Sequence, residues 1–279
     1  MAASCILNFF QYFCIAVALL VPVVCKLYTS SRRCHFYLKM VFYMCYVMAT
    51  SFLIIVFAVR DPFNPDNTRT IGGWLLFHIF KVDKFLGITI EERGLENFAI
   101  DGPFIIACNH QSSLDLIPMF HSAPKRCTGM GKRELLFAGP FGFAALLCGG
   151  VFVDRRPGQA RTTMDKVARD MKDKNFRLWM FPEGTRNHTS GMLPFKKGAF
   201  HLALQAGIPI VPVVVSSYKS YYDKKTYKFE DGKMIITVLP AVSQKPYSLE
   251  TVQEYADTVR TQMLKVFEST SAEAALKHH

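Results

Sequence analysis

The chain begins with two long apolar stretches, and each is long enough to form a membrane helix. No charged side chain occurs between Met1 and Cys25, and a second uncharged stretch runs from Met40 to Val59. About 20 helical residues cover the roughly 30 Å hydrocarbon core of a bilayer. We therefore expect residues 1–59 to form an N-terminal helical hairpin in the membrane. A cleaved signal peptide is the alternative for the first stretch, but no basic residue precedes it and no small-residue cleavage site follows it.

The connection between the two stretches is basic, because it holds Lys26, Arg32, Arg33 and Lys39. The positive-inside rule places such a short connection on the cytosolic side. Two full spans would then leave everything after Arg60 in the lumen, although the rest of the chain is itself basic. A hairpin that enters only one leaflet avoids this conflict. Full spanning and a leaflet-embedded hairpin both stay open.

Beyond the turn residues DPFNPDN, short apolar runs alternate with stretches of helical periodicity. The apolar runs are FIIAC, RLWMF, IPIVPVVV and MIITVLPAV, and the helical stretches among them include RTTMDKVARDMKDKN, GAFHLALQAG and LETVQEYADTVRTQMLKVFE. This alternation predicts an α/β domain over residues 60–270, with a central mixed sheet flanked by helices. Residues 70–85, TIGGWLLFHIFKVDKF, predict one amphipathic or interfacial helix, and residues 271–279 predict a disordered tail.

Composition narrows the class of partner. Among 279 residues, 33 lysines and arginines face 22 aspartates and glutamates, and the net charge of +11 favours an anionic partner. The cations form no basic helix and no pattern interleaved with aromatic residues, so we expect no nucleic acid. The eight cysteines show no CxxC pair and no Cys/His ligand spacing. No metal is expected.

The first candidate chemistry follows the apolar run at residues 104–108, which continues as NHQSSLD. A carboxylate that holds one imidazole nitrogen leaves the other free to act as a base, so Asp115 could orient His110. Five positions along a helix rotate a side chain by about 140°, so His110 must lie on the turn before the helix. The alternative is that both residues merely cap that helix.

A second run, RLWMF, continues as PEGTRN, and two basic clusters, GKRELLF and GGVFVDRR, lie between the two runs. In open α/β sheets, ligands collect beyond the carboxyl ends of the strands, so these segments predict one shared cleft. Ser112 and Ser113 lack a GxSxG elbow, so a serine nucleophile is not expected.

These motifs together resemble those of the glycerolipid acyltransferases. NHQSSLD is similar to their NHxxxxD motif, FPEGTRN to their EGTR motif, GVFVDRR to their intermediate basic motif, and IPIVPVV to their proline-containing block. Their order and spacing also agree over roughly residues 60–240. The resemblance is strongest to the 1-acylglycerol-3-phosphate acyltransferases of the alpha and beta type.

The resemblance implies that His110, oriented by Asp115, removes the proton of the sn-2 hydroxyl of lysophosphatidic acid. That hydroxyl then attacks the thioester of acyl-CoA directly. Guanidinium groups suit a phosphomonoester. The expected phosphate ligands are Arg186 first, then one of Arg155 and Arg156 and one of Lys132 and Arg133.

Other residues receive roles from the same resemblance. Glu183 would hold the glycerol backbone or brace an arginine, Gly184 and Thr185 would contact substrate, and Pro212 would line an acyl pocket or belong to the core. Lys196 and Lys197 would meet anionic CoA or lipid headgroups, or face solvent. Acyl-CoA is expected as a co-substrate with no bound cofactor, membrane lipids as further partners, and the endoplasmic reticulum as the location.

Three alternatives remain from the sequence. The acceptor could be glycerol 3-phosphate or another lysophospholipid, or the chain could be a catalytically silent membrane scaffold.

Asn187, His188 and Thr189 form a glycosylation pattern that is usable only in the lumen. Because a glycan beside the EGTR motif conflicts with activity, this position favours a cytosolic site.

Overall fold

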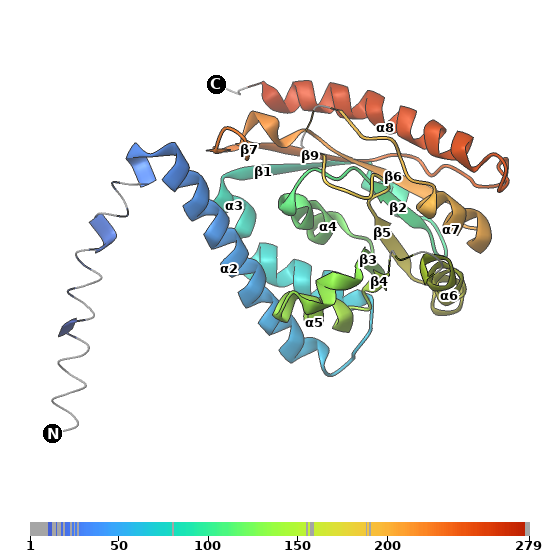
Figure 1. Ribbon diagram of the computed structural model, residues 1–279, viewed down its shortest axis with the longest axis horizontal. Coiled ribbons are helices and arrows are strands. Elements are labelled where there is room, and N and C mark those ends of the chain that lie inside the picture. The colour runs from blue at the N-terminus through green and yellow to red at the C-terminus, as the bar shows by residue number, and fades with distance from the viewer. Residues whose placement is uncertain are drawn as a thin grey trace.

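The structure is a computed structural model, and it describes residues 28–276 except residues 80, 155, 157, 158, 188 and 190, together with scattered positions from residue 11 to residue 26. A mixed sheet of seven strands forms its centre, in the order β1-β9-β6-β2-β5-β3-β4. All neighbouring strands are parallel except β6 and β9, which are antiparallel. The predicted α/β fold with a mixed sheet is confirmed (Figure 1).

The strands of this sheet are β1 (Ile88–Arg93), β2 (Ile105–Cys108), β3 (Cys127–Lys132), β4 (Val151–Val153), β5 (Arg177–Met180), β6 (Ile210–Val215) and β9 (Gly232–Val238), and a small hairpin holds β7 (Tyr222–Asp223) and β8 (Lys228–Phe229). The α-helices are α2 (Arg32–Ala58), α3 (Val82–Leu86), α4 (Leu116–Ser122), α5 (Pro140–Leu147), α6 (Gln159–Lys174), α7 (Gly198–Ala206) and α8 (Val252–Ala275). A π-helix covers Thr68–Ile79, and 3-10 turns cover Leu95–Phe98, Ser113–Asp115, Arg133–Phe137 and Tyr218–Ser220.

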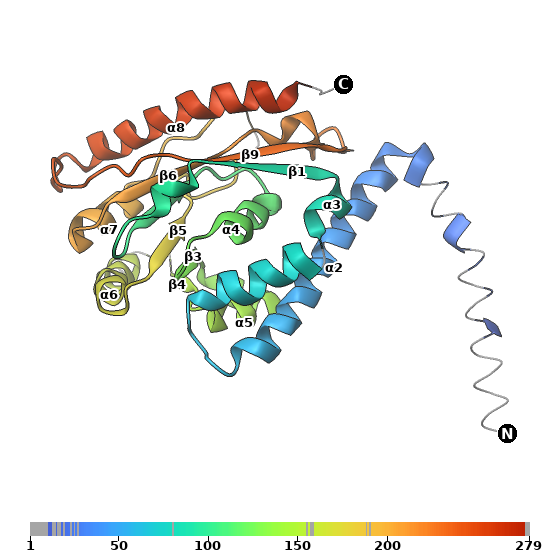
Figure 2. The same cartoon turned by 180° about the vertical axis from the view of Figure 1, so that it is seen from behind.

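A separate hydrophobic core covers each face of the sheet, and the side chains of β2 contribute to both cores. Alternate residues of a strand point to opposite faces. Ile105 and Ala107 belong to the core beneath α6, α7 and α8, whereas Ile106 and Cys108 belong to the core that includes α2 and α4. Figures 1 and 2 show α8 on one side of the sheet and α2, α4 and α5 on the other. Burial on both faces explains the uninterrupted apolar run of this strand.

Helix α2 contains the second of the two apolar stretches up to Ala58, and it changes the expected position of the basic residues. It begins after its N-cap, Ser31, so Arg32, Arg33 and Lys39 lie within the helix and not in a connecting loop. The helix has 27 residues and a mean hydropathy of 2.2 over its most apolar window, which is long and apolar enough to cross a membrane. Most of the first apolar stretch, and with it the other helix of the hairpin, lies outside the described residues.

One side of α2 packs on the α/β domain, which distinguishes this helix from an isolated membrane span. Its buried positions recur every three or four residues, at Phe36, Lys39, Tyr43, Val47, Thr50, Ser51, Ile54 and Ala58. Large apolar side chains on its other side, including Val41, Phe52 and Val56, are exposed. The helix therefore presents an apolar surface outward while it closes one side of the domain.

Two further expectations are corrected. Residues 70–85 form a π-helix and the separate helix α3, and Lys81 between them has a φ of 47°. Gly72 and Gly73 allow a close approach to α4, because a Cβ on Gly73 would lie 2.7 Å from the Phe120 carbonyl oxygen.

The C-terminal helix continues to Ala275, where disorder was predicted from residue 271. Arg93 of β1 donates a hydrogen bond of 2.8 Å to Glu273 of this helix.

Candidate active site

The loop after β2, residues 109–115 and hereafter the His110 loop, holds the predicted pair. His110 lies on the turn before the 3-10 turn Ser113–Asp115, as its spacing from Asp115 required. The Nδ1 atom of His110 is 2.6 Å from Oδ2 of Asp115. Asp115 is only 3% exposed. The carboxylate therefore fixes the imidazole and leaves Nε2 available for proton transfer.

Asp115 also organises the backbone of this loop. Its Oδ2 accepts hydrogen bonds from the backbone N–H groups of Gln111, at 2.7 Å, and Ser112, at 2.9 Å. Ser112 Oγ in turn accepts from the N–H of Leu114, which completes a capping box. Capping and orientation of His110 are thus two functions of one carboxylate, and the sequence had presented them as alternatives.

Glu183 braces the His110 loop from the neighbouring strand β5. One of its carboxylate oxygens accepts from the backbone N–H of His110 and the other from that of Leu193, both at 2.8 Å. Glu183 is buried, and burial raises the pKa of its carboxyl group, although these two donors oppose the shift. Both oxygens therefore hold backbone in this structure, and a further role of Glu183 in holding glycerol or an arginine stays a prediction.

Two contacts of this loop were not found from the sequence. The ring of Phe181 stacks on the imidazole of His110 with a centroid distance of 4.2 Å. The side chain of Asn109 exchanges two hydrogen bonds with the backbone of Val215, at 3.0 and 2.8 Å, and so joins the ends of β2 and β6. The only available signal was position, because Asn109 directly follows a predicted strand and Phe181 is the last residue of another.

A cavity of about 920 Å³ opens beside His110. Its walls come from α2, α4 and α5 and from the carboxyl ends of β3, β4 and β5, and apolar side chains dominate them. Tyr43 lines it beside the His110 loop, and Ile54 lines it eleven residues further along α2, which is about 16 Å at 1.5 Å per residue. The cavity thus follows α2 over this distance and offers apolar walls to a fatty acyl chain.

Three cations line this cavity with His110, namely Lys132, Arg186 and Lys196. Arg133 and Arg156 do not line it, and both donate to the carboxylate of Asp154. The hydrogen bonds from Arg156, with a smaller contribution from Arg133, lower the pKa of Asp154 well below its usual range. The structure thus separates the members of the predicted basic pairs, with Lys132 at the cavity and Arg133 and Arg156 in an ion cluster outside it. Arg155 lies outside the described residues.

The remaining predicted residues fall into two groups. Gly184 and the exposed Thr185 line the cavity. Gly184 has a φ of 69°, and a Cβ there would lie 2.8 Å from Cδ of Lys196, so both conformation and space favour glycine. Pro212 is buried in β6 beside Ala107 of β2 and does not line the cavity, so its core alternative agrees with the structure and the pocket alternative does not.

Asn187, the acceptor residue of the glycosylation pattern, lies beside the His110 loop. Asn187 is 7% exposed, its Nδ2 donates to the carbonyl of Gly191 at 2.8 Å, and its Oδ1 accepts from the N–H of Thr189 at 2.8 Å. Its own N–H donates to the carbonyl of His110 at 2.7 Å. Because Asn187 is buried and its Nδ2 faces the Gly191 carbonyl, a glycan on that atom has little room in the folded site.

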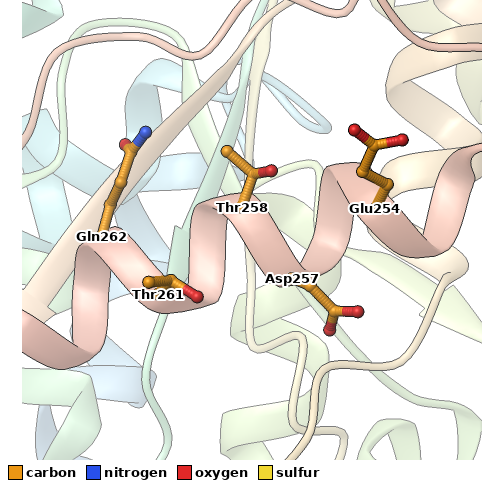
Figure 3. Close-up of a pocket in the computed structure, with 5 residues that line it drawn as sticks. All are labelled: Glu254, Asp257, Thr258, Thr261 and Gln262. Atoms are coloured by element: carbon orange, nitrogen blue, oxygen red, sulfur yellow. The ribbon is translucent and has the colours of Figure 1, made fainter.

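A second depression lies on the outer side of α8, remote in sequence from these motifs, and Figure 3 shows its five lining residues along that one helix. They are Glu254, Asp257, Thr258, Thr261 and Gln262. It contains no imidazole, thiol or cation and offers no comparable chemistry. Among the residues that the structure describes, no group of three or more His, Cys, Asp or Glu side chains is arranged to hold a metal ion.

Comparisons with known proteins identify the family of this chain. A family model described as Acyltransferase matches residues 89–216. The human 1-acyl-sn-glycerol-3-phosphate acyltransferase alpha is 44% identical over 250 residues, which are 88% of this chain and 86% of that protein. The human beta protein is 37% identical over 257 residues, which are 91% of this chain and 90% of that protein.

A solved structure shares the fold. The crystal structure of the 1-acyl-sn-glycerophosphate (LPA) acyltransferase from Thermotoga maritima matches with a TM-score of 0.55 and 21% identity, and the match covers 83% of this chain and 98% of that one. This likeness shows the α/β fold, and the family model assigns residues 89–216 to the acyltransferases. The similarity to the human proteins assigns the chain to the family of 1-acyl-sn-glycerol-3-phosphate acyltransferases, which confirms the resemblance seen in its motifs.

Proposed function

We propose that this protein transfers a fatty acyl group from acyl-CoA to the sn-2 hydroxyl of 1-acyl-sn-glycerol 3-phosphate, giving phosphatidic acid and CoA. The observation that carries this proposal is the 2.6 Å contact between His110 Nδ1 and Asp115 Oδ2 at a cavity that also holds cations and apolar walls. The names of the relatives support the same substrate.

The reaction proceeds in one covalent exchange. His110 Nε2 removes the proton of the acceptor hydroxyl, and the hydroxyl oxygen attacks the thioester carbonyl carbon. The carbon–sulfur bond then breaks, and the imidazolium returns its proton to the departing CoA thiolate. An ester bond replaces a thioester bond, no acyl-enzyme forms, and Asp115 stabilises the transient positive charge on His110.

Lys132 and Arg186 bind the phosphomonoester of the acceptor in this proposal. Both line the cavity with His110, and neither takes part in an ion pair among the described residues. Cations that are not already neutralised by a carboxylate are available for phosphate. Lys196, beside Gly184, is available for the phosphates of CoA.

The apolar helix α2 supports a site at a membrane. Tyr43 and Ile54 of that helix line the cavity, so an acyl chain reaches the site without leaving an apolar environment. We propose that the N-terminal region lies in the cytosolic leaflet of the endoplasmic reticulum. The inward packing of Lys39 and Tyr43 on the α/β domain supports this arrangement over a free transmembrane span.

The acceptor is tested by incubation of purified protein with labelled acyl-CoA and a panel of lysolipids together with glycerol 3-phosphate. Phosphatidic acid from 1-acyl-sn-glycerol 3-phosphate is the expected main product. A preference for another acceptor would contradict the proposed substrate, and absence of transfer to every acceptor would support a silent scaffold. Retention of the complete His110–Asp115 pair is not needed by a scaffold.

A further inference from the structure

A tyrosine outside every recognised motif contacts the far side of the His110–Asp115 pair. Tyr218 begins the 3-10 turn Tyr218–Ser220, which follows β6. Its Oη donates to Oδ1 of Asp115 at 2.8 Å, whereas His110 contacts Oδ2. Tyr218 is 2% exposed, so the contact is shielded from solvent. The three side chains form a continuous chain of hydrogen bonds that ends at the imidazole.

We propose that Tyr218 is a positioning residue for acyl transfer, which fixes the orientation of Asp115 and disperses its negative charge. This inference rests on the proposed function, because it assigns a role within the same reaction. Tyr218 does not line the cavity and so does not contact substrate. It acts through Asp115 on the basicity and the direction of His110.

The turn that carries Tyr218 is joined to the His110 loop by a second side chain. Nε2 of Gln111 donates to the carbonyls of Val215, at 3.1 Å, and Ser216, at 2.9 Å. Oε1 of Gln111 accepts from the backbone N–H of Tyr218 at 3.2 Å. This double attachment keeps the phenol at a constant position relative to Asp115.

The chemistry of a buried phenol makes Tyr218 a constant donor. Burial and the negative charge of Asp115 raise the pKa of Tyr218 well above 10, so the group remains protonated at neutral pH. A neutral phenol beside a carboxylate donates its proton and shares the charge, as hydrogen bonds to ionised groups do. Loss of this donor leaves Oδ1 of a buried carboxylate less well satisfied.

Other titratable or charged groups also face the pair, and they constrain the interpretation of a pH profile. They are Tyr43 from α2, Cys108 at the end of β2, Glu183 and Arg186 after β5, and Tyr221 and Tyr222 beside the turn. Burial raises the pKa of Cys108 and of Tyr221 well above their usual values, so neither changes charge near neutral pH. A test of Tyr218 must therefore change no charge and no other group.

Tyr218→Phe satisfies this condition because it removes one hydroxyl. A carboxylate with one donor fewer holds the imidazolium proton more strongly, so the acid limb of kcat/KM should move to higher pH by about half a unit. The carboxylate is also less constrained, so kcat should fall about tenfold, as expected from the loss of one hydrogen bond to a charged group. KM for the acceptor should change by less than about twofold, because the substitution does not alter the cavity wall.

Tyr221→Phe is a matched control. Tyr221 is also fully buried, its ring centroid lies 5.8 Å from that of Tyr218, and its hydroxyl has no hydrogen-bond partner among the described residues. This substitution removes the same atom from the same turn without touching Asp115. The control should keep both kcat and the pH profile of the wild type.

The pH profiles of kcat and kcat/KM for the two variants, with melting temperatures, form the decisive experiment. The proposal would be overturned if Tyr218→Phe kept the kcat and the pH profile of the wild type. It would also be overturned if both variants lost the same fraction of kcat and the acid limb of kcat/KM did not move. If Tyr218→Phe does not fold, 3-fluorotyrosine at position 218 provides a stronger donor of nearly equal size. It should move the acid limb to lower pH, and no movement would again overturn the proposal. Failure of the wild type to acylate any acceptor would instead reject the proposed function.

Discussion

Tyr43 of the apolar helix α2 donates from its Oη to the carbonyl oxygen of Ser113 at 2.8 Å. Ser113 lies in the 3-10 turn that ends at Asp115, so a residue of the apolar helix holds the backbone next to this carboxylate. His35 and Lys39, eight and four residues earlier on the same helix, contact the carbonyls of Phe229, at 2.8 Å, and Leu86, at 3.1 Å. The apolar helix is therefore part of the active-site scaffold.

Tyr43→Phe should lower kcat about fivefold, because the Ser113 carbonyl loses a buried donor and the turn before Asp115 is less constrained. Tyr37→Phe is the control, since Tyr37 lies on the same helix, is 53% exposed and contacts Tyr227 and not the His110 loop. Steady-state kinetics in mixed micelles would measure both. Equal activity of the two variants would show that α2 does not support the catalytic turn.

Phosphate recognition should depend on the cations of the cavity and not on those of the Asp154 cluster. Lys132→Ala and Arg186→Ala should each raise KM for the phosphate-bearing acceptor about tenfold or more, the effect of one charge-assisted hydrogen bond. Arg156→Ala is the comparison, because Arg156 already donates to Asp154 at 3.0 Å, and its KM should change about threefold or less. A larger effect from Arg156 than from Arg186 would contradict this assignment.

The length of the accepted acyl chain should depend on the cavity wall contributed by α5. Ala144 lines the cavity and is 3% exposed, so Ala144→Phe should fill part of it and favour shorter acyl donors. The ratio of kcat/KM for long and short acyl-CoA should fall about tenfold. Phe143→Ala is the control on the same helix, because Phe143 is 48% exposed and does not line the cavity, and an equal change there would exclude the cavity as the cause.

The ionisation of Glu183 should make stability depend on pH in a definite direction. Burial raises the pKa of this carboxyl group above its usual 4.5. The protonated form of Glu183 is favoured in the folded protein. The stabilisation that follows is therefore fully present below pH 4.5, and it is lost as the pH rises through the pKa of Glu183 in the folded protein. Glu183→Gln cannot titrate, so the melting temperature of the wild type relative to this variant should decline as the pH rises from 4.5.

Asp154 provides a control of opposite sign. Its pKa lies below the usual 3.8 because Arg156 and Arg133 donate to it. The stabilisation from its charged form is complete above pH 3.8 and is lost as the pH falls below it, so the melting temperature relative to Asp154→Asn should increase as the pH rises toward 3.8 and then level off. If both melting-temperature differences changed with pH in the same direction, burial of Glu183 and the arginines beside Asp154 would not control the pKa values of these two groups.

Particular elements explain how far the sequence could predict this molecule. Strands β2, β5 and β6 are buried on both faces and read as apolar runs, whereas β1 (ITIEER) and β3 (CTGMGK) are rich in polar residues or glycine and were missed. The His110–Asp115 pair spans five positions and was found from its spacing. Tyr218 lies 103 residues from Asp115, and no local pattern relates them.

Side-chain direction was equally hidden from the sequence. Lys132 and Arg133 are adjacent, but the end of β3 directs Lys132 to the cavity while Arg133 pairs with Asp154 at 3.0 Å. The resemblance to the acyltransferases implied that Glu183 holds the glycerol backbone or braces an arginine. Its use as an acceptor for two backbone N–H groups depends on the proximity of β2 and β5, which only the sheet order supplies.

The most direct test of the central claim is the rate of acyl transfer to 1-acyl-sn-glycerol 3-phosphate by His110→Ala, with His121→Ala as the matched control. His121 pairs with Glu92 at 3.0 Å and does not line the cavity. Loss of a general base should lower kcat of His110→Ala by about a thousandfold or more, while His121→Ala retains most of its activity. Transfer by His110→Ala at a rate close to that of the wild type would contradict the account.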